Sequence, residues 1–108
     1  FNRLNSLVVL NLAYNQLSGI PAGIFSPLTK LLDLYLDKNK IQALPANAFS
    51  GLASIQGIYL TYNNLNLIPR GEFRELSSLR ELYLTGNSLS ASDVSQLTEE
   101  LGSIVHLD

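Results

Sequence analysis

The sequence predicts an α/β solenoid: a curved stack of short coils with a parallel β-sheet on the concave face and a mostly irregular or 3-10 convex side. Three observations predict this fold. A set of apolar columns recurs every 24 residues along the 108-residue chain. Within each repeat, apolar and polar residues alternate as they do in a strand with one buried face. The last repeat changes to a helical pattern near residues 91–101.

The composition limits the class of molecule. A length of 108 residues suits one domain, and hydrophobic residues make up 46% of it against 15% charged residues. The absence of Cys excludes disulfides, Cys-ligated zinc and cysteine nucleophiles. Seven Lys plus Arg against nine Asp plus Glu give a net charge of −2. We therefore expect no nucleic-acid partner, and the short apolar runs predict no membrane insertion.

Four segments carry the recurring pattern. They begin at Leu7, Leu31, Ile55 and Leu79, and they read LVVLNLAYNQL, LLDLYLDKNKI, IQGIYLTYNNL and LRELYLTGNSL. Each fits L-x-x-L-x-L-x-x-N-x-L, with Ile replacing Leu at three positions. All the phenylalanines follow the same 24-residue step: Phe1, Phe25, Phe49 and Phe73. Because several columns recur in phase, we interpret the whole chain as one repeat array.

Each segment predicts a short strand and then a turn. Leu10 and Leu12 alternate with outward residues, and strands repeated in phase form a parallel sheet with a spacing of about 4.8 Å. An Asn follows each strand, where its amide can satisfy turn backbone groups that water does not reach. We expect these residues to form a structural ladder: Asn15, Asn39, Asn63 and Asn87. A proline in the second half of the repeat then fixes an extended bend on the outer arc.

The fourth repeat departs from this pattern in its second half. Asp93 and Leu97 stand where the other repeats have Pro and Phe, and SASDVSQLTEELG predicts a helix over about 91–101. Ser90 or Ser92 is the expected N-cap, and Val94 and Leu97 begin an apolar stripe that faces the core. This segment is either a second repeat subtype or a single longer convex connection.

The pattern divides the single domain of residues 1–108 into a partial repeat at 1–6, repeats at 7–30, 31–54, 55–78 and 79–103, and the start of another at 104–108. The last full unit has 25 residues, which places Ile104 in the Leu79 column and Leu107 in the Leu82 column. Both ends fall inside a repeat without a polar capping unit. We therefore expect a fragment of a longer array, with end-to-end self-association through uncapped termini as the alternative.

On these residues the chain resembles the leucine-rich repeat family, in its 24-residue form with Pro and Phe in the second half. Its last repeat is similar to the helical repeats of the ribonuclease-inhibitor type. The resemblance covers essentially all of residues 1–108 and implies a horseshoe segment that binds a protein or peptide without catalysis. It also implies an alternative, because some bacterial members carry a ubiquitin-ligase domain: the chain would then be the substrate-recognition part of an enzyme. An architectural spacer is the remaining alternative.

The outward strand positions are the candidate partner-binding surface. They hold all five tyrosines of the chain, with Tyr35, Tyr59 and Tyr83 in one column. Tyr gives a large contact area with few rotatable bonds, which suits protein recognition, although strand propensity and cross-strand stacking explain the same column without a partner. Nearby carboxylates favour a partner with basic residues. The candidate residues are Tyr14, Asp33, Tyr35, Asp37, Lys38, Tyr59, Tyr62, Glu81 and Tyr83.

No residue pattern points to catalysis, a cofactor or a metal. His106 is the single histidine and takes an outward position in the terminal strand, where a structural or solvent-exposed role is expected. Asp33 and Asp37 lie at one strand's edge and are weighed as a calcium site, but exposed carboxylates lack the burial that tunes catalytic groups. We therefore predict that the chain is not an enzyme and needs neither cofactor nor metal.

The compartment is predicted from the family and the composition. The 24-residue form is common in extracellular, cell-surface and bacterial secreted proteins. The chain has ten Asn without an Asn-x-Ser/Thr sequon and no Cys, unlike a glycosylated, disulfide-capped animal ectodomain. We expect a secreted or extracellular protein, or one exported to a host cell as a bacterial effector, with a cytoplasmic protein as the alternative.

Overall fold

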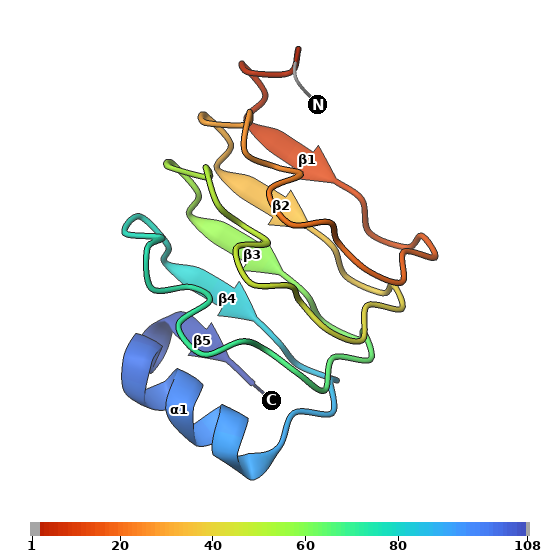
Figure 1. Cartoon of the computed structure of the whole chain (residues 1–108), viewed down its shortest axis with the longest axis vertical. Coiled ribbons are helices and arrows are strands. Elements are labelled where there is room, and N and C mark those ends of the chain that lie inside the picture. The colour runs from red at the N-terminus through yellow and green to blue at the C-terminus, as the bar shows by residue number, and fades with distance from the viewer. Residues whose placement is uncertain (1–2, 108) are drawn as a thin grey trace.

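The computed structural model describes residues 3–107 and shows a solenoid whose strands form one parallel sheet in the order β1-β2-β3-β4-β5 (Figure 1). The strands are β1 (Val9–Asn11), β2 (Asp33–Tyr35), β3 (Gly57–Tyr59), β4 (Glu81–Tyr83) and β5 (Val105–His106). The predicted α/β solenoid with a parallel sheet is therefore confirmed. Phe1, the first member of the phenylalanine column, lies outside the described residues.

The sheet keeps a 24-residue register through β4 and then shortens it by one residue. Asp33 pairs with Gly57 and Gly57 with Glu81, whereas Leu82 pairs with Val105, a step of 23. The predictions that Ile104 falls in the Leu79 column and Leu107 in the Leu82 column are therefore wrong. The return before β5 contains a helix whereas the other returns consist of turns, and the rise per residue differs between the two, so residue count alone does not set the register. The register is set by the residues that point into the core, since Val105 takes the place next to Leu82.

The recurring apolar columns build one continuous core between the sheet and the convex turns. Its inner members, such as Leu34, Leu36 and Ile58, are fully buried. Along the convex side, the rings of Phe25 and Phe49 stack at 6.3 Å and those of Phe49 and Phe73 at 5.6 Å between centroids. Each coil thus covers the apolar face of the next, as stacked repeats require.

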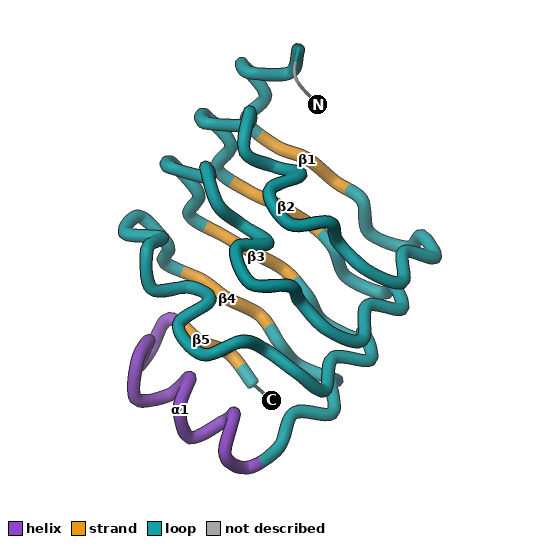
Figure 2. Tube along the Cα trace, viewed as in Figure 1, coloured by secondary structure: helices purple, strands orange, loops and turns teal. Residues whose placement is uncertain are grey.

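The convex returns of the first three coils consist of turns, and the fourth contains α1 (Ala91–Leu101) followed by the 3-10 turn η1 (Gly102–Ile104) (Figure 2). The helix therefore covers the predicted range 91–101. Of the two candidate N-caps the structure selects Ser90, whose hydroxyl accepts the backbone N–H of Asp93 at 3.1 Å. Leu97 packs the helix onto the core. None of the described helices is long and apolar enough to cross a membrane.

Candidate functional site

The asparagine column joins neighbouring coils at the point where each strand ends. The side-chain NH2 of Asn63 donates to the carbonyls of Leu60 and Leu36, at 3.1 and 3.0 Å. Its Oδ1 accepts the backbone N–H of Ile41 at 3.2 Å. Because Leu36 and Ile41 belong to the preceding coil, one buried amide satisfies backbone groups of two coils.

The other members of the column repeat this arrangement where a preceding coil is present. Asn39 donates to the Leu12 carbonyl, and Asn87 to the Leu60 carbonyl, each one coil back. Asn15 is exposed and donates only within its own coil, to the carbonyls of Leu12 and Ala13. The column therefore fixes the turn that carries the outward residues of the sheet.

A ladder of parallel aromatic rings runs along the middle of the concave face. The centroids of Tyr35 and Tyr59 are 4.4 Å apart, those of Tyr59 and Tyr83 are 5.2 Å apart, and each pair lies within 11° of parallel. The ring of His106 continues the ladder, 4.3 Å from Tyr83. These four residues, called the ring ladder below, lie opposite one another in the register of neighbouring strands. The ring faces between neighbouring residues therefore contact each other, and the ring edges remain accessible to a partner.

His106 is a site residue that the sequence reasoning missed. Counting 25 residues from the fourth repeat puts it in the Glu81 column, whereas it pairs with Tyr83. The alternation Val105-His106-Leu107, which matches the inward–outward–inward order of residues 82–84, is the signal that identifies its column.

A shallow hollow of about 280 Å³ lies beside the ladder at the side where the strands begin, with Asp33, Gly57, Tyr59 and Glu81 among its lining residues. A Cβ on Gly57 would meet both the Tyr59 hydroxyl and the Asp33 carboxylate, so glycine allows the two groups to approach each other. The hydroxyl donates to Asp33 Oδ1 at 3.5 Å. Burial, and then the nearby Asp33, raise the pKa of Tyr59 above its ordinary value. The phenol consequently stays protonated, and the hollow is lined by the carboxylates of Asp33 and Glu81 together with Arg80.

Asp37 and Asp33 have different hydrogen-bond partners. Asp37 Oδ1 accepts both the backbone N–H and the hydroxyl of Thr61, at 2.8 and 2.6 Å. This carboxylate therefore ties β2 to the following coil. Within residues 3–107, no group of three or more His, Cys, Asp or Glu is arranged to hold a metal ion.

Tyr14, Lys38 and Tyr62 lie one coil apart at the edge where the strands end, and we call them the exit row. All three adopt positive φ angles, of 59°, 57° and 53°. The ammonium of Lys38 lies 5.4 Å from the ring centroid of Tyr14 and 5.2 Å from that of Tyr62. Gly86 holds the same position in the next coil, and its lack of a Cβ makes room for the Tyr62 ring. The exit row thus places one cation between two aromatic faces.

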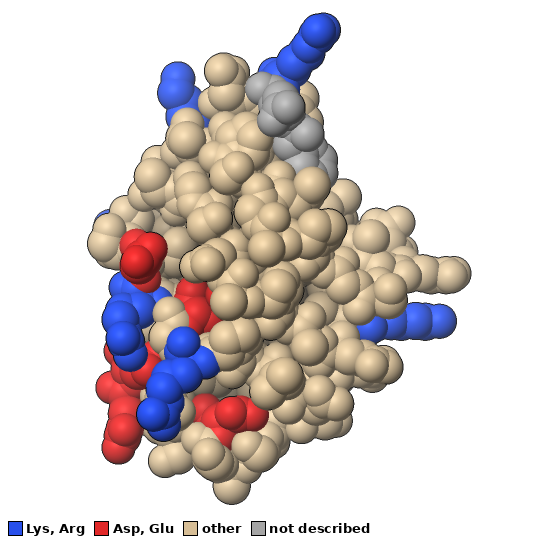
Figure 3. All heavy atoms as spheres, in the orientation of Figure 1, with Lys and Arg blue, Asp and Glu red and all other residues tan. Residues whose placement is uncertain are grey.

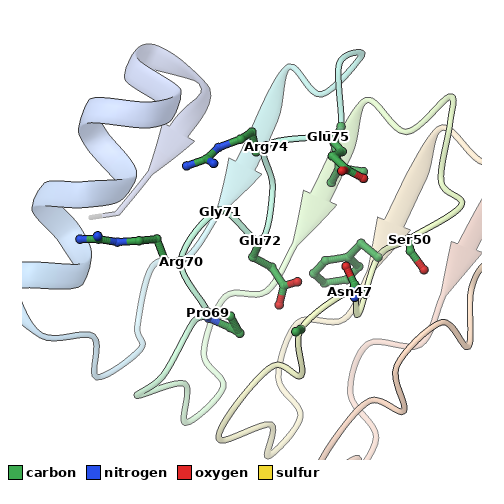
Figure 4. A pocket seen from close by; sticks show the side chains of 11 residues that line it. Asn47, Ser50, Pro69, Arg70, Gly71, Glu72, Arg74 and Glu75 are labelled. Carbon is green, nitrogen blue, oxygen red and sulfur yellow. The ribbon is translucent and has the colours of Figure 1, made fainter.

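The convex side has a hollow of about 210 Å³ that contains an unusual carboxylate, Glu72. Both oxygens of Glu72 are buried without a hydrogen-bond partner among the described residues. Figure 4 shows this side chain directed toward Asn47, whereas Arg70 and Arg74 extend away from it. Burial raises the pKa of Glu72, and the nearby backbone N–H groups of Ala48 and Asn47, although not aligned for hydrogen bonds to the carboxylate, partly oppose the shift. No sequence motif marks this residue.

Charged side chains are unevenly distributed over the molecule. In the orientation of Figure 3, acidic and basic side chains gather toward the lower left, near α1, and much of the remaining visible face carries none. One ion pair there joins Arg74 to Glu100 at 3.3 Å. Because the two signs are interspersed, this region does not form a broad single-sign patch.

A protein family matches the sequence, and a solved structure matches the fold. Residues 1–41 and 30–89 match the family described as "Leucine rich repeat", and residues 78–101 match a second family of that description. No curated protein matches the chain. The crystal structure of a TLR13–ssRNA13 complex is similar, with a TM-score of 0.88 and 30% identity over 100% of this chain and 16% of that one. The present chain thus spans a small part of that molecule.

The similar structure corrects one prediction from the sequence. Composition and net charge led to the expectation that nucleic acid is not a partner. A chain with this fold is instead found in a complex with RNA, so that exclusion is wrong. The net charge of −2 describes the average over the chain and does not decide what one surface binds.

Proposed function

Because the chain belongs to the leucine-rich repeat family, we propose that this interaction-type repeat module binds a protein or peptide partner on its concave sheet. The observation that supports the proposal is the ring ladder, in which Tyr35, Tyr59, Tyr83 and His106 stack without interruption. Stacked rings have few alternative rotamers, so a partner loses little of its binding energy to ordering them. The module performs no catalysis itself in this proposal.

Single-stranded RNA is the second candidate, because the similar TLR13 structure is a complex with ssRNA13. Sequence-tolerant binding of bases uses aromatic faces that are free to stack. In the ladder, the faces of the inner rings, Tyr59 and Tyr83, are stacked on neighbouring rings. We therefore favour a polypeptide that contacts ring edges and hydroxyls, and RNA is tested beside it.

The wider setting stays a prediction from the sequence. A bacterial secreted or host-directed protein is the favoured setting. The substrate-recognition part of a larger enzyme and an architectural spacer are the alternatives.

The test combines a random-peptide display library with single-stranded RNA homopolymers, each offered to the immobilised chain. Peptides selected on the wild type are measured against Tyr59→Ala and against the variant with Tyr35, Tyr59 and Tyr83 all changed to Ala. We expect Tyr59→Ala to weaken binding by about 2 kcal/mol, the scale of an interface hot spot. Leu67→Ala is the control, because Leu67 is 56% exposed and lies outside the concave strands. Circular dichroism confirms that each variant is folded.

The outcomes separate the candidates. Peptides that bind the triple variant as tightly as the wild type would remove the concave face from the proposal. RNA that binds the wild type and is lost in the triple variant, with no peptide selected, would replace a protein partner by a nucleic acid.

A further inference from the structure

The ammonium group in the exit row has aromatic neighbours and no acidic partner. Within residues 3–107, Lys38 contributes to no ion pair, and its Nζ contacts the rings of Tyr14 and Tyr62. The nearest acid in sequence, Asp37, already accepts two hydrogen bonds from Thr61. Lys38 is exposed, as are both tyrosines, at 75% and 57%. Its N–H donors are therefore available to a group from outside the chain.

The backbone at the exit row is strained for residues that carry a side chain. A positive φ disfavours residues with a Cβ by about 1–2 kcal/mol. Gly86 shows that glycine fits this position in the next coil, with φ of 78°. Tyr14, Lys38 and Tyr62 nevertheless keep large side chains there. Strain of this kind is typical of positions at which a side chain is needed for function.

The two rings also orient the lysine in advance. A free Lys side chain loses up to about 2 kcal/mol of rotamer entropy when it is fixed. Contact with two aromatic faces restricts the Lys38 stem before any partner arrives, so less of this entropy is lost on binding. The exit row is a pre-ordered cation at the rim of the sheet.

We infer that the exit row of Tyr14, Lys38 and Tyr62 is a subsite for an anion, and that its occupant is an Asp or Glu side chain of the protein partner. The inference rests on the proposed function. A carboxylate matches the single positive charge and accepts an N–H of the ammonium at about 2.8 Å. A polyphosphate chain fits less well, because the same face carries three carboxylates: Asp33, Asp37 and Glu81.

The subsite also orients the partner across the sheet. Lys38 lies where the strands end, whereas Asp33 and Glu81 lie where they begin, with the ring ladder between. The hollow is lined by two carboxylates, Asp33 and Glu81, against one guanidinium, Arg80, so a basic group of the partner is favoured there when its acidic group lies over Lys38. In the reversed orientation, the partner's basic group would lie over Lys38 and its acidic group over Asp33 and Glu81. Like charges would then repel at both places, so one orientation of the partner across the sheet is selected.

The test uses peptides selected from the random-peptide display library on the wild-type chain. Each selected peptide is remade with Gln in place of each Glu and Asn in place of each Asp, and affinities are measured for wild type and Lys38→Met. Met keeps an aliphatic stem against the rings and removes the charge. We expect that at one acidic position of the peptide, the change from acid to amide weakens binding to the wild-type chain roughly tenfold. The same change is expected to leave binding to Lys38→Met unaltered.

Two variants make the result specific to the exit row. Lys40→Met is the matched control, because Lys40 is an exposed lysine two residues further along the chain. The cation–π contacts with Tyr14 and Tyr62 are made by Lys38 and not by Lys40. This control is expected to leave the acidic preference unchanged. Lys38→Gly is the second test variant, since Gly86 shows that glycine adopts the required φ, and it is expected to lose the preference while remaining folded.

Failure of this inference is distinguishable from failure of the proposed function. If Lys38→Met keeps the acidic preference while tyrosine replacements abolish binding, the subsite is overturned and the concave-face proposal stands. If tyrosine replacements have no effect, the proposed function itself is overturned. RNA homopolymers that bind through Lys38, with no acidic peptide selected, would replace the carboxylate by a phosphate.

Discussion

Asn63 shows how a single side chain can hold two coils together. Its amide exchanges hydrogen bonds with Leu36 and Ile41 of one coil and with Leu60 of its own. The side chain is 5% exposed, so water is not available to replace these contacts. The backbone groups that it satisfies would otherwise be buried and unpaired.

We predict that Asn63→Ala lowers the free energy of unfolding by about 3 kcal/mol, because it leaves several buried backbone groups without partners. Asn15→Ala is the matched control, since Asn15 is exposed and bonds only within its own coil. It is expected to lower the free energy by no more than about 1 kcal/mol. Urea denaturation of the two variants measures the difference, and equal losses would contradict the inter-coil role.

Glu72 gives a pH-dependent prediction. Because burial raises its pKa in the folded chain, the folded state holds this proton more tightly than the unfolded state does. The contribution of Glu72 to stability therefore decreases as the pH rises from the ordinary value of 4.5 through the raised value. Removing the charge should stabilise the chain at neutral pH and not below 4.5.

We predict that Glu72→Gln raises the free energy of unfolding near neutral pH by up to about 1 kcal/mol, discounted because the site is partly solvated. Denaturant titrations near neutrality and below pH 4.5 measure the change. Glu75→Gln, at an exposed neighbouring position, is the control and should show no such difference. A gain for Glu72→Gln that is the same at both pH values would contradict the buried-charge explanation.

Beside His106, whose column was misassigned, two features of the site have no repeat column that predicts them: the Glu72 carboxylate and the position of Lys38 between two rings. The positions equivalent to Glu72 in the two preceding repeats hold Ile24 and Ala48, so the repeat pattern does not predict a carboxylate there. Lys38 is one of the residues predicted for partner binding, but its position between two rings depends on where the side chains of left-handed residues point. Side-chain direction of that kind is not encoded in a repeat period.

At the scale of elements, strands and helix followed from different patterns. Period-two alternation and the 24-residue step predicted β1 to β4, whose register the structure reproduces. Capping and the apolar stripe predicted α1. The predicted register of β5 was wrong because it assumed that a return containing a helix sets the register by residue count, as the turn returns do. Alternation, which follows the buried face directly, identifies the pairing of Tyr83 with His106.

Helix α1 begins with a cap whose removal is measurable. Ser90 accepts the N–H of Asp93, and no other side chain among the described residues accepts a backbone N–H in the first turn. We predict that Ser90→Ala lowers the free energy of unfolding by about 1 kcal/mol. Ser92→Ala, within the helix, should change it by less than about 0.5 kcal/mol. Thermal or urea unfolding distinguishes the two, and equal effects would contradict the cap assignment.

At the scale of the whole molecule, stability should vary along the stack. The first coil presents Val8 and Val9, 45% and 49% exposed, and its Leu10 and Leu12 are only partly buried. The central coils have both neighbours, and the last coil is covered by α1 through Leu97. Because repeats are stabilised by nearest neighbours, the first coil should open most easily.

Hydrogen exchange followed by mass spectrometry tests this gradient. We predict that amides of β3 exchange at least about tenfold more slowly than those of β1, a difference of about 1.4 kcal/mol in opening free energy. Amides around α1 and β5 should be intermediate. Uniform protection from β1 to β5 would instead show that the chain opens as one cooperative unit.

The shortened step between β4 and β5 has a consequence for how such a molecule can change. The strand that follows a helical return pairs with its neighbour in the sheet just as the strands that follow turn returns do. The rings of Tyr83 and His106 are still stacked, with centroids 4.3 Å apart. The convex side can thus gain, lose or exchange residues while the row of rings remains unbroken. Length variation and ligand recognition are therefore separable, so one side of the chain is free to diverge while the other is held to its contacts.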